Sequence, residues 1–391
     1  MEAHEFRELF LLDPEITFLN HGSFGATPRV VFESYQRWQR ELEKQPVKFL
    51  GREIHELLLF ARKALAGFIH TDFDDIVFIP NATTGVNILA RSINLQPGEG
   101  LLTTNQEYGA CARTWNFLSR QSGFSICQVK LSTPFYSKDD LITEICSSFS
   151  PTVKAIFISH ISSTTSVIFP IKEICLRARE AGILTIIDGA HAPGQVDLNI
   201  EEIGCDFYIG NLHKWLCAPK GSAFLYARKE IQPLVQPFIV SWGWESENPS
   251  HSQFIDYLEW TGTNDMSAFL AVPDAIQFQR TYEWEKVRYR CHELASATRH
   301  QIELLSGRPG LYPDSSDWYS QMVSVRLPDE VETLLLKNTL YDNYSIEVPI
   351  LDWEGMKLIR ISIQAYNSPT DVEKLINALK EILNFNITLE R

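Results

Sequence analysis

Short apolar runs rich in β-branched residues alternate with longer amphipathic stretches from about residue 75 to residue 230. The runs occupy residues 76–79, 101–104, 155–158, 184–187, 207–209 and 223–226. Candidate helices at 82–94 and 171–181 lie between them, and in the second the apolar positions recur at helical spacing. This alternation predicts βα units that build a mostly parallel sheet, and therefore an α/β fold.

A second pattern begins at about residue 271. A long helical stretch covers 271–306, strands are expected at 322–325 and 358–361, and helices are expected near 329–339 and 369–384. A chain of 391 residues exceeds the length at which a single core keeps growing. We therefore expect a large domain over 16–270 and a smaller C-terminal α/β domain over 271–391, which also includes residues 1–15.

The composition is that of an ordinary globular enzyme, with 45% hydrophobic and 21% charged residues. The formal net charge of -14 and the lack of a basic run argue against a nucleic-acid partner, because phosphate backbones are bound by clustered Lys and Arg. No stretch approaches the roughly 18 apolar residues that span a bilayer, and the first residues lack a signal-peptide pattern, so we expect a cytoplasmic protein. The seven cysteines are scattered without a Cys-x-x-Cys pair, so neither a disulfide framework nor a metal site is expected.

Three features follow predicted strands, where open α/β sheets place their ligand crevice. The first is Asn81-Ala82-Thr83-Thr84-Gly85, which follows the run 76–79 and opens a predicted helix. Free backbone N–H groups at a helix N-terminus, with two hydroxyls beside them, can bind an anion. A simple N-cap uses the same residue types, so both interpretations stay open here.

The second feature is Asp188-Gly189-Ala190-His191, at the end of the strand near 184–187. A carboxylate in this place can pair with a protonated ring nitrogen and keep a pyridine cationic, which lets the ring accept electrons. Asp-Gly is also a frequent turn dipeptide, and a turn is the alternative interpretation.

The third feature is His213-Lys214-Trp215, after the strand near 207–209. A lysine between an imidazole and an indole is partly desolvated, which lowers its pKa and makes the amine a better nucleophile for a Schiff base. By itself, a lysine is more often a solvated surface charge. Together, a phosphate cradle, a ring-nitrogen partner and an imine-forming lysine in this order are what pyridoxal 5'-phosphate (PLP) requires.

With these motifs, the chain resembles the fold-type I PLP-dependent transferases of aminotransferase class V, a family that includes the cysteine desulfurases. It is most similar to their isopenicillin N epimerase-like branch, over essentially all of residues 16 to 384. Further matching segments are Phe18-Leu19-Asn20-His21-Gly22-Ser23-Phe24-Gly25 and Ile359-Arg360-Ile361-Ser362. The resemblance implies that Lys214 forms the Schiff base, that Asp188 pairs with the pyridine nitrogen, and that His191 lies near the ring hydroxyl.

The resemblance also implies how the rest of the cofactor is bound. Thr83 and Thr84, with His213, would hold the phosphate, and Tyr108 would stack on the ring. Where desulfurases carry Ser three positions before the lysine, this chain has Asn211, whose amide can still donate a hydrogen bond.

Other matching positions concern the substrate and a partner subunit. Arg360 would bind the α-carboxylate of an amino-acid substrate, for which a planar guanidinium is well suited, although a structural ion pair would also use it. Asn20 and His21 would belong to the mouth of the active site, although a turn would use the same residues. Thr263 would reach the phosphate of a neighbouring subunit, which implies a homodimer with shared sites. Apart from the resemblance, Trp242, Trp244 and Arg52 are pocket candidates in the sequence, and core aromatics and a surface charge would explain them as well.

One departure from the family bears on the reaction. Desulfurases place a sulfur-accepting cysteine in the segment that corresponds to residues 345–357, and this chain has none there. We therefore expect an enzyme that removes the Cα proton of an amino acid, as an epimerase or a C–S lyase. An aminotransferase is the alternative, and a desulfurase or a non-catalytic PLP-binding protein is disfavoured.

Overall fold

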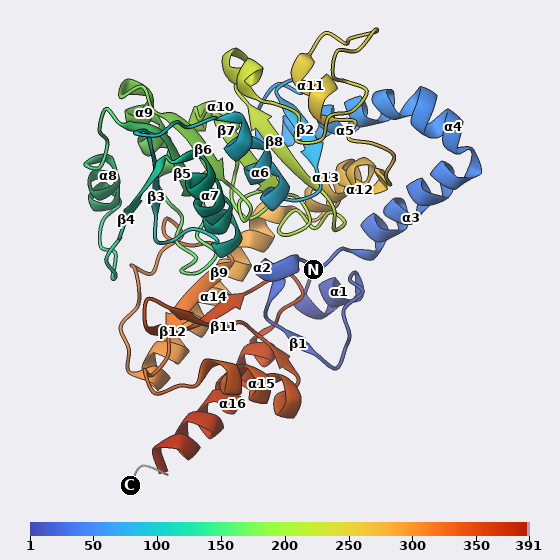
Figure 1. Ribbon diagram of the computed structural model, residues 1–391. Helices are drawn as coiled ribbons and strands as arrows, with labels where there is room; N and C mark the ends of the chain where they lie inside the picture. Colours follow the sequence, from blue (N-terminus) through green and yellow to red (C-terminus); the bar gives the residue numbers. More distant parts are fainter. Residues whose placement is uncertain (389–391) are drawn as a thin grey trace.

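The computed structural model describes residues 1–388 and places a seven-stranded sheet between helices on its two faces (Figure 1). Its strand order is β2-β8-β7-β6-β5-β3-β4, and neighbouring strands are parallel except where they pair with β8. The strands are β2 (Ile76–Ile79), β3 (Gly100–Thr104), β4 (Ser125–Val129), β5 (Val153–Ser159), β6 (Leu184–Asp188), β7 (Phe207–Asn211) and β8 (Ala223–Ala227). The predicted α/β fold with a mostly parallel sheet is confirmed.

Successive residues of the central strands enter two separate apolar cores. In β7, Phe207 and Ile209 lie in one core with residues of α6 (Ala82–Ser92) and α7 (Gly109–Ser122). Tyr208 lies in the other, with residues of α5 (Ile54–Ile69) and α9 (Ile171–Glu180). A strand that is buried on both faces has no polar side, which is why these strands stand out as apolar runs.

The edge strand β4 was not predicted. It is paired on one side only, with β3, and its residues are exposed or half-buried. The other helices of this part are α8 (Lys138–Cys146), α10 (Ile200–Ile203), α11 (Gln253–Leu258), α12 (Ser267–Leu270) and the 3-10 helix η2 (Lys229–Leu234).

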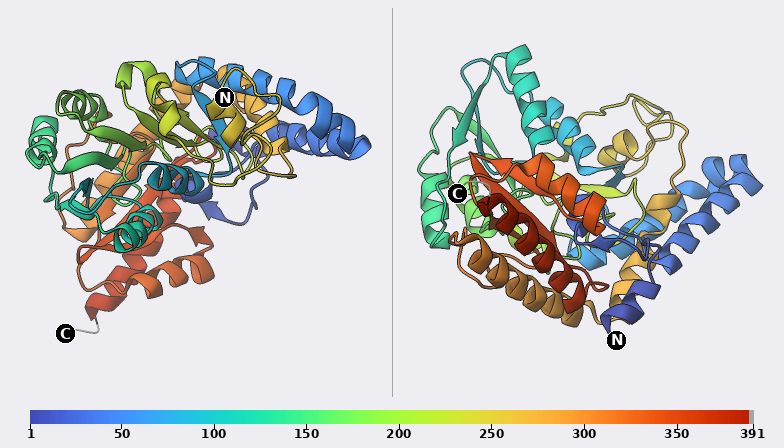
Figure 2. Two further views of the ribbon diagram at one scale, coloured as in Figure 1. Left: turned by 45° about the horizontal axis from the view of Figure 1, so that its top comes forward. Right: turned by 90° about the horizontal axis from the view of Figure 1, so that it is seen from below.

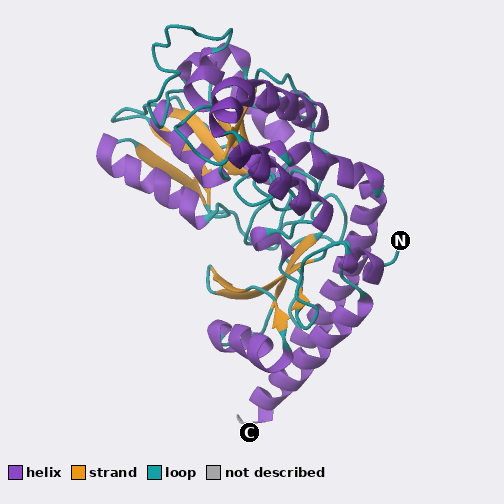
Figure 3. Cartoon of the chain, turned by 90° about the vertical axis from the view of Figure 1, so that its right-hand side faces the viewer, coloured by secondary structure: helices purple, strands orange, loops and turns teal. Residues whose placement is uncertain are grey.

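A smaller antiparallel sheet lies toward the C-terminus, apart from the large one (Figure 3). Its order is β11-β12-β9, formed by Ile350–Trp353, Met356–Ser362 and Met322–Arg326. The helices α14 (Trp284–Ser306) and α16 (Pro369–Thr388) run side by side in this part of the molecule (Figure 2), with α15 (Thr333–Tyr344) near them.

The single helix expected over 271–306 is wrong in one respect. The structure has two helices, α13 (Val272–Thr281) and α14, because Glu283 adopts a left-handed backbone with φ 48° between them. The apolar periodicity continues across the break, so the pattern alone could not reveal it.

The N-terminal segment packs against the C-terminal part. β1 (Thr17–Phe18) pairs in parallel with β10 (Ile346–Glu347), and Phe6 of α1 (Ala3–Glu8) packs edge-on against Trp284. The short helix α2 (His21–Phe24) follows β1 and leads to the long helix α3 (Arg29–Lys44). The predicted division into domains stays a prediction, and no helix of the described residues is long and apolar enough to cross a membrane.

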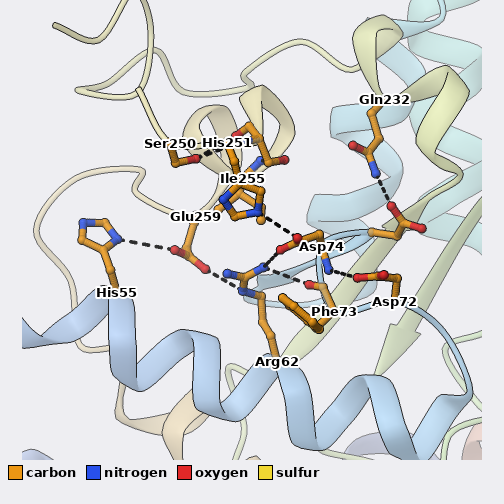
Figure 4. A network of polar contacts seen from close by, with 12 residues as sticks. His55, Arg62, Asp72, Phe73, Asp74, Gln232, Ser250, His251, Ile255 and Glu259 are labelled. Atoms are coloured by element: carbon orange, nitrogen blue, oxygen red, sulfur yellow. Dashed lines mark hydrogen bonds and ion pairs between the residues drawn. The ribbon is translucent and has the colours of Figure 1, made fainter. Parts of the chain in front are cut away.

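A buried ion pair fastens the segment after residue 250 to helix α5, which follows α4 (Pro46–Lys48) and the π-helix η1 (Phe49–Glu53) (Figure 4). Arg62 Nε lies 3.0 Å from Glu259 Oε1, and Arg62 Nη1 donates to the carbonyl oxygen of Phe73 at 2.9 Å. His55 approaches the other oxygen of Glu259 at 3.5 Å, and His251 contacts Asp74 at 2.8 Å. The segment that leads to Thr263 is therefore held through Glu259 by Arg62, which lies about two turns after the start of α5.

Candidate active site

A cavity of about 340 Å³ opens beside the carboxyl ends of β6 and β7 and the first turn of α6. Ligand crevices of open α/β sheets lie at this edge, and the volume suits a small cofactor. The structure brings together here the residues Thr83, Tyr108, Asp188, His191, Asn211, His213 and Lys214, all of them singled out in the sequence.

Lys214 and His191 meet inside the cavity. Lys214 Nζ lies 3.1 Å from His191 Nε2, and His191 Nδ1 accepts a hydrogen bond of 3.2 Å from the Trp215 indole. Burial, together with the positive charge of Arg360, lowers the pKa of Lys214 to about 8, while the negative charge of Asp188 opposes the change. An amine with this pKa is partly neutral near physiological pH, as a Schiff-base nucleophile must be.

Asp188 is a buried carboxylate that has no cationic partner among the described residues. Its Oδ1 accepts from the backbone N–H of Ala190 at 3.0 Å, and its Oδ2 lies 3.6 Å from the thiol of Cys111. Burial raises the pKa of Asp188. A buried carboxylate that faces a cavity without a counterion is suited to a cationic ligand group, such as a protonated ring nitrogen.

Glu107 is a half-buried acid near Asp188, which sequence reasoning missed. Thr104 Oγ1 and Ser159 Oγ each donate to its carboxylate at 2.7 Å. Burial raises the pKa of Glu107 to about 7, despite these two hydrogen bonds, and the charge of Asp188 adds to the rise. Its position before Tyr108 was visible in the sequence, but nothing in the local pattern indicated that its carboxylate is withdrawn from solvent and bound by two hydroxyls.

The first turn of α6 forms one wall of the cavity. Asn81 caps the helix by accepting from the backbone N–H of Thr84 at 2.9 Å, and Asn211 Oδ1 accepts from the backbone N–H of Ala82 at 2.9 Å. The Thr84 hydroxyl turns back to Asn81, at 3.1 Å, whereas Thr83 lines the cavity. Asn81 is therefore an N-cap, and the turn that it caps faces the cavity, whereas anion binding at this turn stays a prediction.

Two other side chains line the cavity beside this turn. His213 contacts the carbonyl oxygen of Ser222 at 3.2 Å, and burial lowers its pKa to about 4. Tyr108, at the N-cap of α7, is 49% exposed and makes no capping hydrogen bond, so its ring is free to contact a ligand.

Arg360 is a buried guanidinium without a carboxylate partner in the described part of the chain. Its Nη1 donates to the carbonyl oxygen of Ser163 at 2.6 Å and to the Ser163 hydroxyl at 3.0 Å, and its Nη2 donates to Ser23 Oγ at 2.9 Å. Its Nε has no partner. Both serines line the cavity, and burial lowers the pKa of Arg360 to about 10, so an anion that enters there would relieve an unpaired buried charge.

Other predicted site residues do not line the cavity. His21 is fully buried behind Lys214, with its ring 2.9 Å from both the Lys214 carbonyl oxygen and the Tyr366 hydroxyl. Asn20 is buried and donates to Glu347 at 2.9 Å. Thr263 is exposed on a loop. The further pocket candidates are also elsewhere, namely Trp242, Trp244 and Arg52.

The donor set fits PLP. The cavity combines an amine of lowered pKa, an unpaired buried carboxylate and a capped helix N-terminus, and it places an unpaired guanidinium behind two serines of its wall. These groups would bind, in turn, an aldehyde carbon, a ring nitrogen, a phosphate and the carboxylate of a second molecule.

Comparison with known proteins agrees with this chemistry. The model of the family "Aminotransferase class-V" matches residues 24–375. The isopenicillin N epimerase of Amycolatopsis lactamdurans is 36% identical over 388 residues, which cover 96% of this chain and 97% of that protein. A probable chloroplastic L-cysteine desulfhydrase of Arabidopsis thaliana is 29% identical, over 95% of this chain and 84% of the relative.

The fold is shared with solved structures at lower identity. The apo structure of a cysteine desulfurase from Thermococcus onnurineus superposes with a TM-score of 0.85 at 19% identity, and the match covers 98% of each chain. At this identity the likeness concerns the fold alone.

Proposed function

Because the chain belongs to the aminotransferase class V family, whose members are PLP enzymes, we propose that it acts on an α-amino acid by removing the Cα proton, as an epimerase or a C–S lyase. The observation that carries the proposal is the convergence of Lys214, Asp188 and His191 on one cavity, with Arg360 behind its wall. Each of these four groups has a pKa displaced by burial, as is typical of functional sites.

The proposed roles follow from the positions of the side chains. Lys214 holds the cofactor as a Schiff base, Asp188 keeps its ring nitrogen protonated, and the first turn of α6 binds its phosphate. Tyr108 contacts the ring from the open side of the cavity. When bound, PLP supplies an electron-withdrawing ring that stabilises negative charge at Cα of an attached amino acid.

The substrate would be held by Arg360 through its α-carboxylate. The guanidinium is already oriented by Ser163 and Ser23, so little side-chain entropy would be lost when the carboxylate binds. Lys214 Nζ is the proposed base for the Cα proton, since a pKa of about 8 leaves a useful neutral fraction of the amine.

The two candidate outcomes are each supported by relatives. Epimerisation is favoured by the isopenicillin N epimerases of Amycolatopsis lactamdurans and Streptomyces clavuligerus, at 36% and 35% identity. Elimination of a sulfur leaving group is favoured by the plant L-cysteine desulfhydrases, at 29% and 30% identity. Transamination is the alternative that the family description keeps open.

A desulfurase that forms a persulfide on a cysteine is disfavoured. The segment 345–357, where such a cysteine is expected, contains none, and within it residues 346–347 form β10 and residues 350–353 form β11. Cys111 does line the cavity, but burial and the charge of Asp188 raise the pKa of its thiol, which opposes the thiolate that sulfur transfer needs.

We further propose a cytoplasmic homodimer with shared active sites. Thr263 is exposed and lies away from the cavity of its own chain, as a residue that serves a neighbouring subunit would. Sedimentation of the purified protein at several concentrations should give the mass of a dimer, and a monomer at all concentrations would refute this part.

The Schiff-base lysine can be identified directly. We expect that borohydride reduction of the PLP-supplied protein, followed by peptide mass spectrometry, will find the pyridoxyl group on Lys214. The matched control is Lys220, a nearby lysine whose pKa is also lowered by burial, and label on Lys220 or no label would contradict the proposal.

The reaction can then be assigned with single amino acids in deuterated water, followed by NMR. Deuterium at Cα with inversion indicates epimerisation, a keto acid with released sulfide indicates the lyase, and a keto acid with pyridoxamine phosphate indicates transamination. No exchange and no product with any amino acid would favour a non-catalytic PLP-binding protein.

A further inference from the structure

Trp215 makes a hydrogen bond whose direction leaves no choice. Its indole N–H can only donate, and it lies 3.2 Å from His191 Nδ1. His191 Nδ1 must therefore accept with its lone pair. In a neutral imidazole the single proton is then carried by Nε2, the nitrogen that faces Lys214.

The imidazolium form of His191 is disfavoured by the same contact, because a protonated Nδ1 would point its hydrogen at the indole N–H. The surroundings act in the same direction. Burial holds the pKa of His191 well below its usual value, and the positive charges of Lys214 and Arg360 add to the effect. The ring is thus neutral across the physiological range.

The state of Lys214 follows from this tautomer. An N–H of His191 at Nε2 needs an acceptor, and an ammonium group has only donors, whereas a neutral amine has a lone pair. We propose that Trp215 is a positioning residue that locks His191 in the Nε2-protonated tautomer and thereby favours the neutral amine of Lys214 over the ammonium. This inference deepens the proposed function, since it rests on Lys214 being the nucleophile that captures the cofactor.

The indole is firmly placed. Trp215 is fully buried, its ring centroid is 5.1 Å from that of His21, and its carbonyl oxygen accepts from Gln279 at 2.7 Å. A Cβ on Gly22 would lie 3.3 Å from the indole, so a side chain there would crowd the ring. The orientation of the donor is fixed by packing and does not depend on the cofactor.

Other charged groups around Lys214 do not replace this contact. Arg360 disfavours the ammonium, whereas Asp188 favours it. Within the described chain no carboxylate forms an ion pair with Lys214 Nζ, so His191 Nε2 is its nearest hydrogen-bonding partner. Removal of the indole N–H would free His191 to protonate Nδ1 instead, and Nε2 could then accept from an ammonium.

The first test uses the full-length wild-type protein without bound cofactor. Nitrogen-15 NMR of the histidine rings, with the His191 signals identified by their loss in His191→Gln, reports which nitrogen carries the proton. We expect Nε2 to be protonated and Nδ1 to be the bare, accepting nitrogen. A proton on Nδ1, or on both nitrogens at pH 7, would overturn the proposal without any change to Trp215.

The second test changes the donor. In Trp215→Phe we expect the pKa of Lys214 to rise by about one unit, so that its reductive methylation at pH 7, measured by peptide mass spectrometry, slows about tenfold. Trp115→Phe is the matched control, because Trp115 is equally buried and its indole N–H has no partner. An unchanged rate in Trp215→Phe, with circular dichroism and melting like those of the control variant, would also overturn the proposal.

These outcomes are separate from the fate of the proposed function. If the tautomer and the methylation rate are as expected but borohydride finds no cofactor on Lys214, the proposed function is wrong and the positioning role of Trp215 is supported. If the cofactor is found on Lys214 but His191 carries its proton on Nδ1, only the positioning role of Trp215 is wrong.

Discussion

Arg360 and Ser23 are separated by 337 positions in the sequence, and Arg360 Nη2 donates a hydrogen bond of 2.9 Å to Ser23 Oγ. Ser163 accepts from the other terminal nitrogen, so two distant segments orient the guanidinium that a third carries. Neutral hydroxyl and carbonyl oxygens accept hydrogen bonds from both terminal nitrogens of Arg360 but leave its positive charge uncompensated. This is the arrangement expected of a side chain whose anionic partner arrives with the substrate.

We expect Arg360→Lys to raise the substrate KM between tenfold and a hundredfold, because a lysine loses the planar fork that binds a carboxylate through two nitrogens. The absorbance spectrum of bound PLP should not change, since Arg360 is not among the groups proposed to hold it. Steady-state kinetics on the amino acid identified by the deuterium experiment will measure the effect.

Arg326→Lys is the matched control for this change. Arg326 lies on β9, next to the strand of Arg360, but it approaches Asp329 at 3.8 Å instead of facing the cavity. If both variants gave the same KM as the wild type, Arg360 would not be the carboxylate-binding residue.

Gly25 allows the loop after α2 to pass closely over the Lys214 segment. Its backbone has φ 69° and ψ 170°, a conformation that is nearly exclusive to glycine, and an added Cβ would lie 1.9 Å from the carbonyl oxygen of His213. We expect Gly25→Ala to lower the free energy of unfolding by more than about 3 kcal/mol and to weaken PLP retention, because the clash falls next to the Schiff-base lysine.

Gly307→Ala separates the clash from the cost of a positive φ. Gly307 has φ 63° and would meet nothing within 4 Å, so it should lose only about 1 kcal/mol and retain PLP. Denaturant unfolding and cofactor release after gel filtration measure both quantities, and equal effects in the two variants would show that the approach to His213 is unimportant.

The sequence predicted the strands that carry the site because each is buried on both faces and therefore appears as an apolar run. Asp188 and Lys214 could be placed at one edge from these runs, since consecutive parallel strands end on the same side of a sheet. The roles of Tyr108, Thr263 and Arg360 came from family resemblance alone, because single residues at loop or strand positions carry no periodic signal.

What the sequence could not give depends on contacts between distant segments. Glu107 accepts hydrogen bonds from Thr104 and from Ser159, the latter 52 positions away, and the tautomer proposed for His191 depends on the orientation of an indole 24 positions away. The break at Glu283 interrupts a helix without interrupting its apolar pattern. Such features are set by tertiary packing and are visible only in three dimensions.

Glu107 predicts a specific pH dependence for the cofactor-free protein. Its pKa in the folded state is about 7, above the ordinary value of 4.5, so the folded state binds more protons than the unfolded state between these pH values. The contribution of Glu107 to stability therefore falls as pH rises from about 4.5 to 7, and above pH 7 its charge costs up to roughly 3 kcal/mol. We expect Glu107→Gln to remove this cost.

The variant should be more stable than the wild type at pH 8 and equally stable at pH 4, as measured by urea unfolding. Buried His21 and His160, whose pKa values are lowered to about 3, titrate in both proteins and cancel in the difference. Glu180→Gln, on the exposed end of α9, should show no such crossover. A variant that is less stable than the wild type at pH 8 would mean that the charge of Glu107 is stabilised in the fold.

The Arg62–Glu259 pair predicts a link between stability and site assembly. Both side chains are almost fully buried, so Arg62→Met leaves an uncompensated carboxylate and should cost about 3–5 kcal/mol. The double variant with Glu259→Gln should recover part of this loss, whereas Lys286→Met, which breaks an exposed pair with Glu283, should change little.

Because Glu259 precedes Thr263 by four positions, the same double variant also tests whether the ion pair matters for PLP binding. Recovered stability with weakened PLP binding would show that the Arg62–Glu259 pair positions the Thr263 loop for a shared site. Recovery of both stability and PLP binding would limit the role of this ion pair to folding.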